Sequence, residues 1–137
     1  MFFKKKEEKN DNFLIKVCAL LIHAAKIDEN YTDIEEKIIR ETLVKLGLEK
    51  DKTSKIINDA KKIEENSNQI LDFTREVKNL PETDKINIIE ALWSIIYSNK
   101  DADIYETNLM RRLAGLLYVD TKTMGDIKER IKNQNFK

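Results

Sequence analysis

Apolar residues recur along this chain at intervals of three and four positions, which is the spacing of one face of an α-helix. No segment alternates apolar and polar residues over the length of a β-strand. Polar and acidic stretches, together with Gly47 and Pro81, separate the helical patterns. We therefore predict helices over residues 12–26, 32–46, 49–65, 70–78, 82–98, 103–117 and 121–133.

The predicted helix ends carry their own signals. Thr32-x-x-Glu35 is a capping box, in which each residue bonds the backbone N–H of the other. Asp103-x-x-Glu106 is an equivalent signal with Asp at the cap. Gly47 follows the second helix and predicts a left-handed C-terminal cap. The residues predicted to face the core from the second and third helices are Ile34, Ile38, Ile39, Leu43, Ile56, Ile57, Ala60 and Ile63.

The chain also contains a gapless internal repeat with an offset of 71 residues. The matched pairs are Ile15 and Ile86, Leu21 and Leu92, Glu35 and Glu106, Arg40 and Arg111, Leu46 and Leu117, and Ile56 and Ile127. The first three helices therefore correspond to the last three, and the fourth helix connects the two units. Short amphipathic helices with short connections are typical of bundles, so the predicted fold is all-α, a compact bundle of about seven helices with an internal pseudo-twofold repeat.

Composition limits the classes of function. A chain of 137 residues, 41% hydrophobic and 36% charged, suits one folded helical domain with a densely charged surface. Its 25 basic residues balance 25 acidic ones, so no net charge draws it to nucleic acid, which we exclude as a partner. Cys18 is the only cysteine, so we expect no disulfide and a reducing, cytoplasmic location.

The N-terminal segment raises the question of membrane contact. The apolar run from Val17 to Ala25 falls well short of the ~20 residues that a membrane span needs. We expect residues 1–11 to form a disordered arm and residues 12–137 to form a single helical domain. An alternative is that Met1–Lys6, with its two Phe and three Lys residues, makes a peripheral contact with the inner membrane face.

Oxygen-bearing side chains occur at alternate positions in two polar segments, each of which follows an apolar helix. The candidate metal ligands are Asp28, Asn30 and Glu35 in the first segment, and Asn99, Asp101, Asp103 and Glu106 in the second. Such oxygens suit a hard divalent cation, calcium or magnesium. An EF-hand is excluded, because Asp33 and Ile39 stand where its loop needs Gly and Glu. The alternative is that these acids only cap helices, at about 1 kcal/mol for each cap.

Two stretches carry a family resemblance: "EEKIIRETLVKLGL", which begins at Glu35, and "NIIEALWSIIYSNKDADIYETNLMRRLAGLLYV", residues 87–119. Each adjoins or contains an acidic segment, and together they resemble the TerB-like tellurite-resistance family over roughly Phe13 to Ile131. The resemblance implies a seven-helix fold with internal pseudo-symmetry, in bacterial proteins linked to tellurite and other stress tolerance. It also implies metal-ion binding at recurrent positions, which here are Asp28, Glu35, Asn99, Asp103 and Glu106.

This chain departs from the family pattern at both loop openings. Family loops usually open with Asp-Gly, whereas this chain has Asp28-Glu29 and Asn99-Lys100. Loss of Gly removes easy access to a positive φ, at roughly 1 kcal/mol if that geometry is kept. The second loop also offers a neutral ligand beside a positive charge, which makes it the weaker cation site.

Several other side chains have structural explanations. Those expected to serve in the core are Cys18, His23, Trp93 and Tyr97, with His23 buried and hydrogen-bonded. The arginines that follow the loops, Arg40, Arg111 and Arg112, are expected to pair with acids of neighbouring helices, the alternative being a ring around a partner site.

The sequence holds no defensible nucleophile–base set and no Gly-rich phosphate loop. The loop acids are expected to face solvent, whereas acid–base catalysis needs tuned groups in a cleft. We therefore expect no enzymatic activity, and a binding or adaptor module of the tellurite-resistance, stress-response type that binds a divalent metal ion through its two loops. The alternative is a protein-interaction domain without metal, recruited to the inner membrane face. A protein partner is expected in both cases, and a homodimer is an open alternative.

Overall fold

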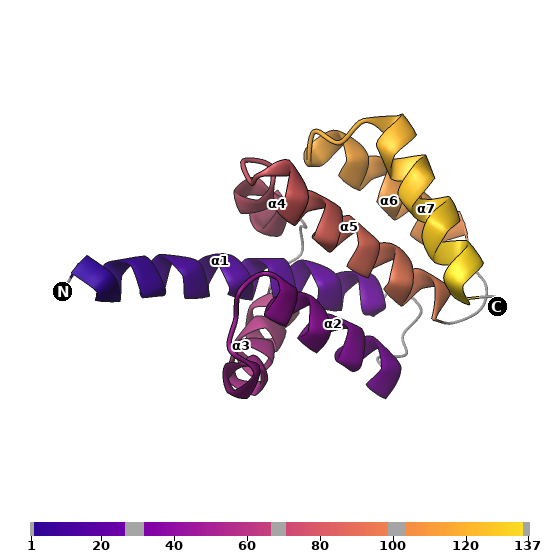
Figure 1. Ribbon diagram of the computed structural model, residues 1–137. Helices are drawn as coiled ribbons and strands as arrows, with labels where there is room; N and C mark the ends of the chain where they lie inside the picture. Colours follow the sequence, from indigo (N-terminus) through magenta and orange to yellow (C-terminus); the bar gives the residue numbers. More distant parts are fainter. Residues whose placement is uncertain (1, 27–31, 67–70, 99–103, 136–137) are drawn as a thin grey trace.

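The computed structural model describes residues 2–26, 32–66, 71–98 and 104–135. The α-helices in these ranges are α1 (Phe2–Ala25), α2 (Asp33–Lys45), α3 (Thr53–Glu65), α4 (Leu71–Val77), α5 (Glu82–Tyr97), α6 (Ile104–Leu116) and α7 (Thr121–Asn135) (Figure 1). A short 3-10 helix, η1 (Lys50–Lys52), precedes α3 where the sequence predicted one continuous helix. The described residues contain no strand, so the prediction of an all-α fold is confirmed.

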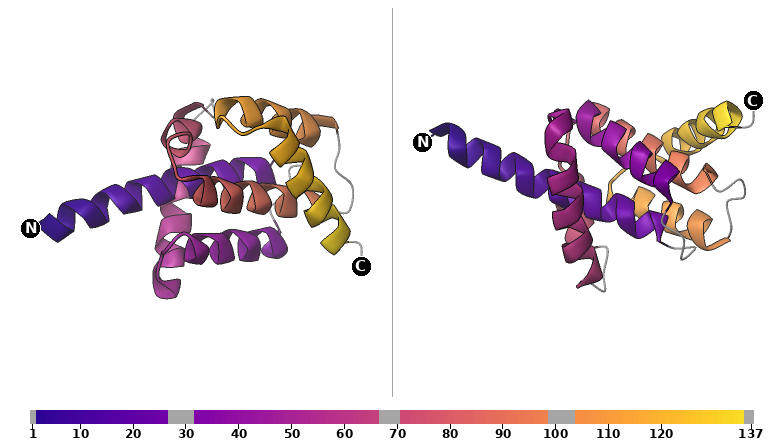
Figure 2. Two further views of the ribbon diagram at one scale, coloured as in Figure 1. Left: turned by 45° about the horizontal axis from the view of Figure 1, so that its top comes forward. Right: turned by 90° about the horizontal axis from the view of Figure 1, so that it is seen from below.

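The first helix differs most from its prediction. α1 begins at Phe2, whereas the sequence analysis placed the helix start at residue 12 and a disordered arm before it. The early segment is rich in Lys and Glu and lacks Gly and Pro, so its helix propensity is good. This half of α1 projects beyond the other helices (Figures 1 and 2). The predicted helix start was wrong, and a domain beginning at residue 12 stays a prediction.

The helices pack around a central pair formed by α1 and α5. α1 packs most extensively against α3 and also contacts α2, α4 and α5. α5 packs most extensively against α7, and α4 contacts both α1 and α6. In Figure 1, α2 and α3 lie on one side of the central pair and α6 and α7 on the other. None of the described helices is long and apolar enough to cross a lipid bilayer.

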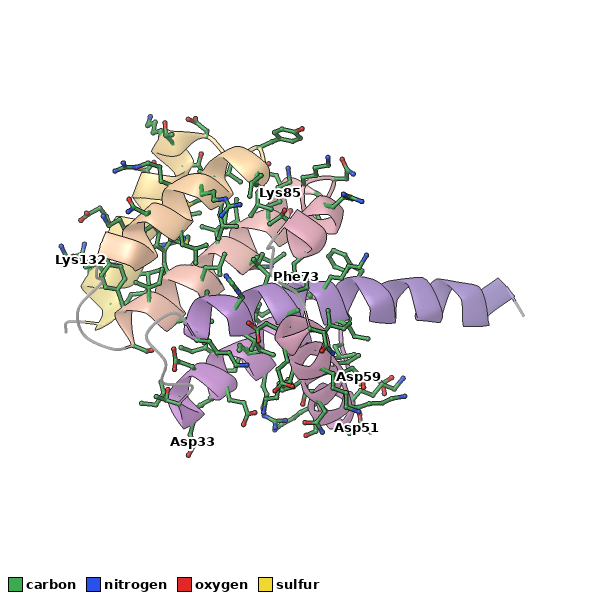
Figure 3. All side chains as sticks on the ribbon, turned by 180° about the vertical axis from the view of Figure 1, so that it is seen from behind. Asp33, Asp51, Asp59, Phe73, Lys85 and Lys132 are labelled. Carbon is green, nitrogen blue, oxygen red and sulfur yellow. The ribbon has the colours of Figure 1, made fainter. Side chains whose placement is uncertain are left out.

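The core draws apolar side chains from all seven helices. Consecutive residues Leu20, Leu21 and Ile22 are fully buried, so neighbours enclose α1 on all sides here. Phe73 of α4 is also buried and lies in the interior (Figure 3). Two predictions were wrong, because Ile34 is 61% and Ile63 40% exposed. Amphipathic spacing marks the direction of the buried face, while the covering helices decide how wide it is.

α2 and α6 end in the same kind of cap. In α2, the Leu48 N–H donates to the Leu43 carbonyl at 3.0 Å and the Gly47 N–H to the Val44 carbonyl at 3.0 Å. This pair of bonds is a Schellman motif, and Gly47 takes the predicted left-handed conformation with φ 107°. α6 ends in the equivalent bonds, with Tyr118 at φ 56° in the place of the glycine. The same pattern of backbone hydrogen bonds therefore ends both helices.

Candidate functional site

The start of α2 holds Glu35, the one predicted ligand whose side chain the structure describes. Thr32 is the N-cap, with an extended backbone (φ −97°, ψ 162°). Its Oγ1 accepts a hydrogen bond from the Glu35 N–H at 3.2 Å. Glu35 Oε1 in turn accepts one from the Thr32 N–H at 2.8 Å. The predicted capping box is therefore confirmed.

Glu35 is fully buried, which corrects the expectation that the loop acids face solvent. The Thr32 hydroxyl also donates to Glu35 Oε1 at 3.0 Å, so one carboxylate oxygen accepts two hydrogen bonds from the cap residue. Such bonds offset the loss of water around a buried carboxylate. A cation at Glu35 would therefore meet a carboxylate that already holds one oxygen in the cap. By contrast, Asp33 is exposed and points outward from α2 (Figure 3).

The other predicted ligands fall where the structure gives no side-chain geometry. Asp28, Asn30, Asn99, Asp101 and Asp103 lie outside the described residues. Glu106 lies in the first turn of α6, but its side chain is not among those described. Within the described part of the chain, no three His, Cys, Asp or Glu side chains are grouped to hold a metal ion.

The helix ends that flank both acidic segments lie at one end of the molecule. α1 and α5 end there, and α2 and α6 begin there, on the side opposite the N-terminus (Figures 1 and 2). The C-terminal end of a helix carries a partial negative charge and the N-terminal end a partial positive charge. A cation bound at this end of the molecule is therefore attracted most strongly to the C-terminal ends of α1 and α5.

Glu64 connects α3 to the end of α1, a link that the sequence analysis missed. Its carboxylate accepts a hydrogen bond from Lys26 Nζ at 2.8 Å, and its other oxygen lies 3.5 Å from His23 Nδ1. The side chain of His23 is 34% exposed, so the expected burial of this histidine was wrong. Nothing local signals the contact, because it joins residues on two different helices.

Arg40 connects α2 to the start of α3. Its Nη1 donates to Thr53 Oγ1 at 3.1 Å and to Ser54 Oγ at 2.9 Å. Its Nη2 lies 3.9 Å from Glu36, one turn earlier on the same helix, and Glu36 lies 3.4 Å from Lys61 of α3. The sequence analysis expected an acid from a neighbouring helix. The i,i+4 spacing of Glu36 and Arg40 was the available signal.

Cys18 is buried and packs in the core, as predicted. Burial raises the pKa of its thiol to about 12, while Lys61, Glu36 and Arg40 shift it less. The thiolate is the nucleophilic and metal-binding form of cysteine, so this thiol stays inert at neutral pH. Trp93 and Tyr97 are buried as predicted, with ring centroids 5.9 Å apart. Burial, followed by the charge of Glu129, raises the pKa of Tyr97.

These features define a class: an all-helical module with a densely charged surface and two acidic segments between helices. Comparison with known families agrees, because the sequence model described as "Tellurite resistance protein TerB" matches residues 14–129. The chain therefore belongs to the TerB family, as the resemblance in its sequence indicated. Searches of curated proteins and of solved structures found no significant match.

Proposed function

We propose that this chain is a non-enzymatic binding or adaptor module of the bacterial tellurite-resistance, stress-response type, and that its acidic segments bind a divalent cation. Membership of the TerB family supports the module. The observation that carries the cation site is the position of four helix ends. The ends of α1 and α5 and the starts of α2 and α6, which flank the two acidic segments in the sequence, lie at one end of the molecule (Figures 1 and 2).

The charges around this end support a cation. The segments carry Asp28 and Asp101, whose carboxylates suit calcium or magnesium. Lys26, the last described residue before the first segment, is paired with Glu64 at 2.8 Å, which offsets the positive charge beside that segment. The negative ends of α1 and α5 add to the attraction. Glu35 holds one carboxylate oxygen in the cap, because its Oε1 accepts two hydrogen bonds there.

Titration of calcium, magnesium and zinc into chelator-treated protein tests this proposal. Calorimetry measures binding, and the unfolding midpoint follows the linked stabilisation, about 2.7 kcal/mol with the ion at about 100 times its Kd. The double variant Asp28→Asn/Asp101→Asn should lose the response. Asp33→Asn, the same exchange at an outward-pointing residue of α2, should keep it. Failure of all three ions to bind the wild-type protein would overturn the cation site.

Glu35→Gln separates an ion ligand from a cap. The amide oxygen of Gln can still accept hydrogen bonds from Thr32, so a pure cap predicts a small loss of stability and an unchanged ion response. A ligand role predicts a weaker ion response, because the exchange removes a negative charge.

We also propose that an internal pseudo-twofold repeat makes the two segments equivalent. The bounds of α2 and α6 differ by the 71-residue offset of the sequence repeat, and their C-terminal caps use equivalent bonds. The strongest helix pairs, α1 with α3 and α5 with α7, are related in the same way. An experimental structure in which residues 32–65 cannot be superimposed on residues 103–136 would contradict the repeat.

A second candidate is a protein-interaction domain that uses no metal and reaches the inner membrane face through its N-terminal segment. Two observations favour it: the capping box at Thr32 is complete, and the N-terminal half of α1 projects from the bundle (Figures 1 and 2). Flotation with anionic and neutral vesicles tests it. Binding to anionic vesicles should disappear in Phe2→Ser/Phe3→Ser, whereas equal flotation of both proteins would exclude this membrane contact.

A pull-down with and without divalent ion then separates the two candidates. A partner captured only with the ion supports the cation-binding adaptor, and a partner captured equally in a chelator supports the metal-free domain.

A further inference from the structure

A hollow of about 200 Å³ lies between α5, α6 and α7. Its lining is apolar where Trp93, Met110, Ala114 and Met124 contribute, and each of these residues is buried. Two basic residues, Arg111 of α6 and Lys128 of α7, complete most of the lining. An apolar surface with a few convergent polar groups is the usual composition of a small-molecule site.

The two basic side chains have no acidic partner among the described residues. Lys128 Nζ lies 5.5 Å from the centroid of the Trp93 ring, in a cation–π contact. Arg111 is exposed, and none of the ion pairs in the described part of the chain includes it or Lys128. The hollow therefore combines a buried aromatic ring with two positive charges that no described carboxylate neutralises.

The residues 71 positions earlier, which match the lining residues in the sequence repeat, have different contacts. The residue 71 positions before Arg111 is Arg40, whose guanidinium donates hydrogen bonds to the hydroxyls of Thr53 and Ser54. The second half has Met124 and Gly125 at those two positions, so neither hydroxyl is present.

Two buried apolar residues of the first half also differ from the residues 71 positions later. Leu43 and Ile57, both fully or almost fully buried, are replaced by Ala114 and Lys128. At Gly125, a Cβ would meet no atom within 4 Å, so the space is open. At these two positions the second half therefore has a smaller side chain than Leu43 and a cation in place of Ile57.

We propose that this hollow binds a small organic anion, a carboxylate attached to a single ring or a short apolar chain. A cavity of about 150 Å³ accepts benzene, so about 200 Å³ suits one ring with a short substituent. The apolar part would lie against Trp93 and the two methionines and lose its contact with water. The carboxylate would lie between Arg111 and Lys128, where charge-assisted hydrogen bonds are available. This site is independent of the cation site proposed above.

Trp93 is the only tryptophan of the chain, so its fluorescence reports directly on the hollow. Titration of the full chain with phenylacetate should change the Trp93 emission saturably. Phenylacetamide, which lacks the charge, and inorganic phosphate, which lacks the apolar part, should each bind more weakly, by about fivefold or more. Equal binding of phosphate would overturn the proposal, because it would show only general attraction of anions to basic residues.

Matched variants locate the binding. Arg111→Gln and Lys128→Gln should each weaken phenylacetate by about fivefold. Arg112→Gln and Lys132→Gln, the same exchanges on the same helices outside the hollow, should change it by less than about twofold. Equal losses in all four variants, or no saturable response of the wild-type protein to phenylacetate, would overturn the site.

Ala114→Leu tests the space itself by restoring the residue type found at Leu43 in the first half. It should abolish phenylacetate binding while the far-ultraviolet circular dichroism stays native. If this exchange unfolds the protein, Gly125→Ala gives the second test, because a Cβ fits there without a clash. A folded variant of either kind that binds phenylacetate as the wild type does would contradict binding in the hollow.

Discussion

At the scale of single residues, Thr32 and Glu35 hold the start of α2 together through three hydrogen bonds. We expect Thr32→Ala to lower the free energy of unfolding by about 1 kcal/mol, because it removes the Oγ1 that accepts the Glu35 N–H. Thr32→Ser keeps that oxygen and should restore most of the loss. Urea unfolding measures both variants.

Thr83→Ala is the control for this prediction. Thr83 is exposed in the first turn of α5, where the N-cap Pro81 makes no side-chain cap bond. The Thr83→Ala exchange should change the free energy of unfolding by less than about 0.5 kcal/mol. Equal effects at Thr32 and Thr83 would mean that the capping box does not stabilise the protein.

The raised pKa of Cys18 predicts that the stability of the protein depends on pH. Burial raises its pKa from an ordinary 9.0 to about 12, so the native thiol keeps a proton that the unfolded chain loses above pH 9.0. Its contribution to stability is therefore complete below pH 9.0 and is lost as the pH rises toward about 12. Relative to Cys18→Ala, the wild-type protein should lose up to about 1.4 kcal/mol of unfolding free energy per pH unit in this window.

Urea unfolding of the two proteins between about pH 8 and pH 10.5 measures this difference. Lysines and tyrosines titrate in the same range, but both proteins contain the same ones, so their effect drops out of the difference in unfolding free energy. Curves that stay parallel throughout would show that the folded protein does not hold the thiol proton.

At the scale of helices, the caps of α2 and α6 use the same bonds with different residues at the left-handed position. Gly47→Ala should cost about 1 kcal/mol, and the cost comes from the backbone because a Cβ there meets no atom within 4 Å. Tyr118→Gly should change stability by less than about 0.5 kcal/mol. The exchange relieves the strain of a tyrosine at φ 56°. This gain offsets the greater flexibility of glycine in the unfolded chain and the lost contact between Lys78 and the Tyr118 ring.

Thermal unfolding of the two variants checks the contrast. Equal changes at Gly47 and Tyr118 would show that backbone conformation does not decide stability at these caps.

At the scale of the whole molecule, the projecting half of α1 should contribute little to the fold. We expect deletion of residues 2–11 to change the free energy of unfolding by less than about 1 kcal/mol, because the helix loses only its outer turns. Phe73→Ala should cost about 3–5 kcal/mol, because Phe73 is 2% exposed and packs in the core. Chemical denaturation measures both variants. If the deletion lowers the free energy of unfolding by clearly more than about 1 kcal/mol, the domain starts before residue 12.

Much of the fold followed from local patterns in the sequence. The helices, the Thr32–Glu35 cap and the left-handed Gly47 each depend on residues within one or two turns, and the structure confirms them. The burial of Trp93 and Tyr97 in α5 was also expected from the sequence. The early start of α1 was missed because a charged segment at a chain end was taken for a disordered arm.

The tertiary structure decided the features that depend on contacts between helices. It left Ile34 exposed, buried Glu35, paired Glu64 with Lys26 and gave Arg40 its hydroxyl partners on α3. It also opened the hollow between α5, α6 and α7, which no spacing rule indicates. The physical reason is range: capping and helical periodicity act over a few neighbouring residues, whereas burial, ion pairing and cavities arise only when distant helices meet.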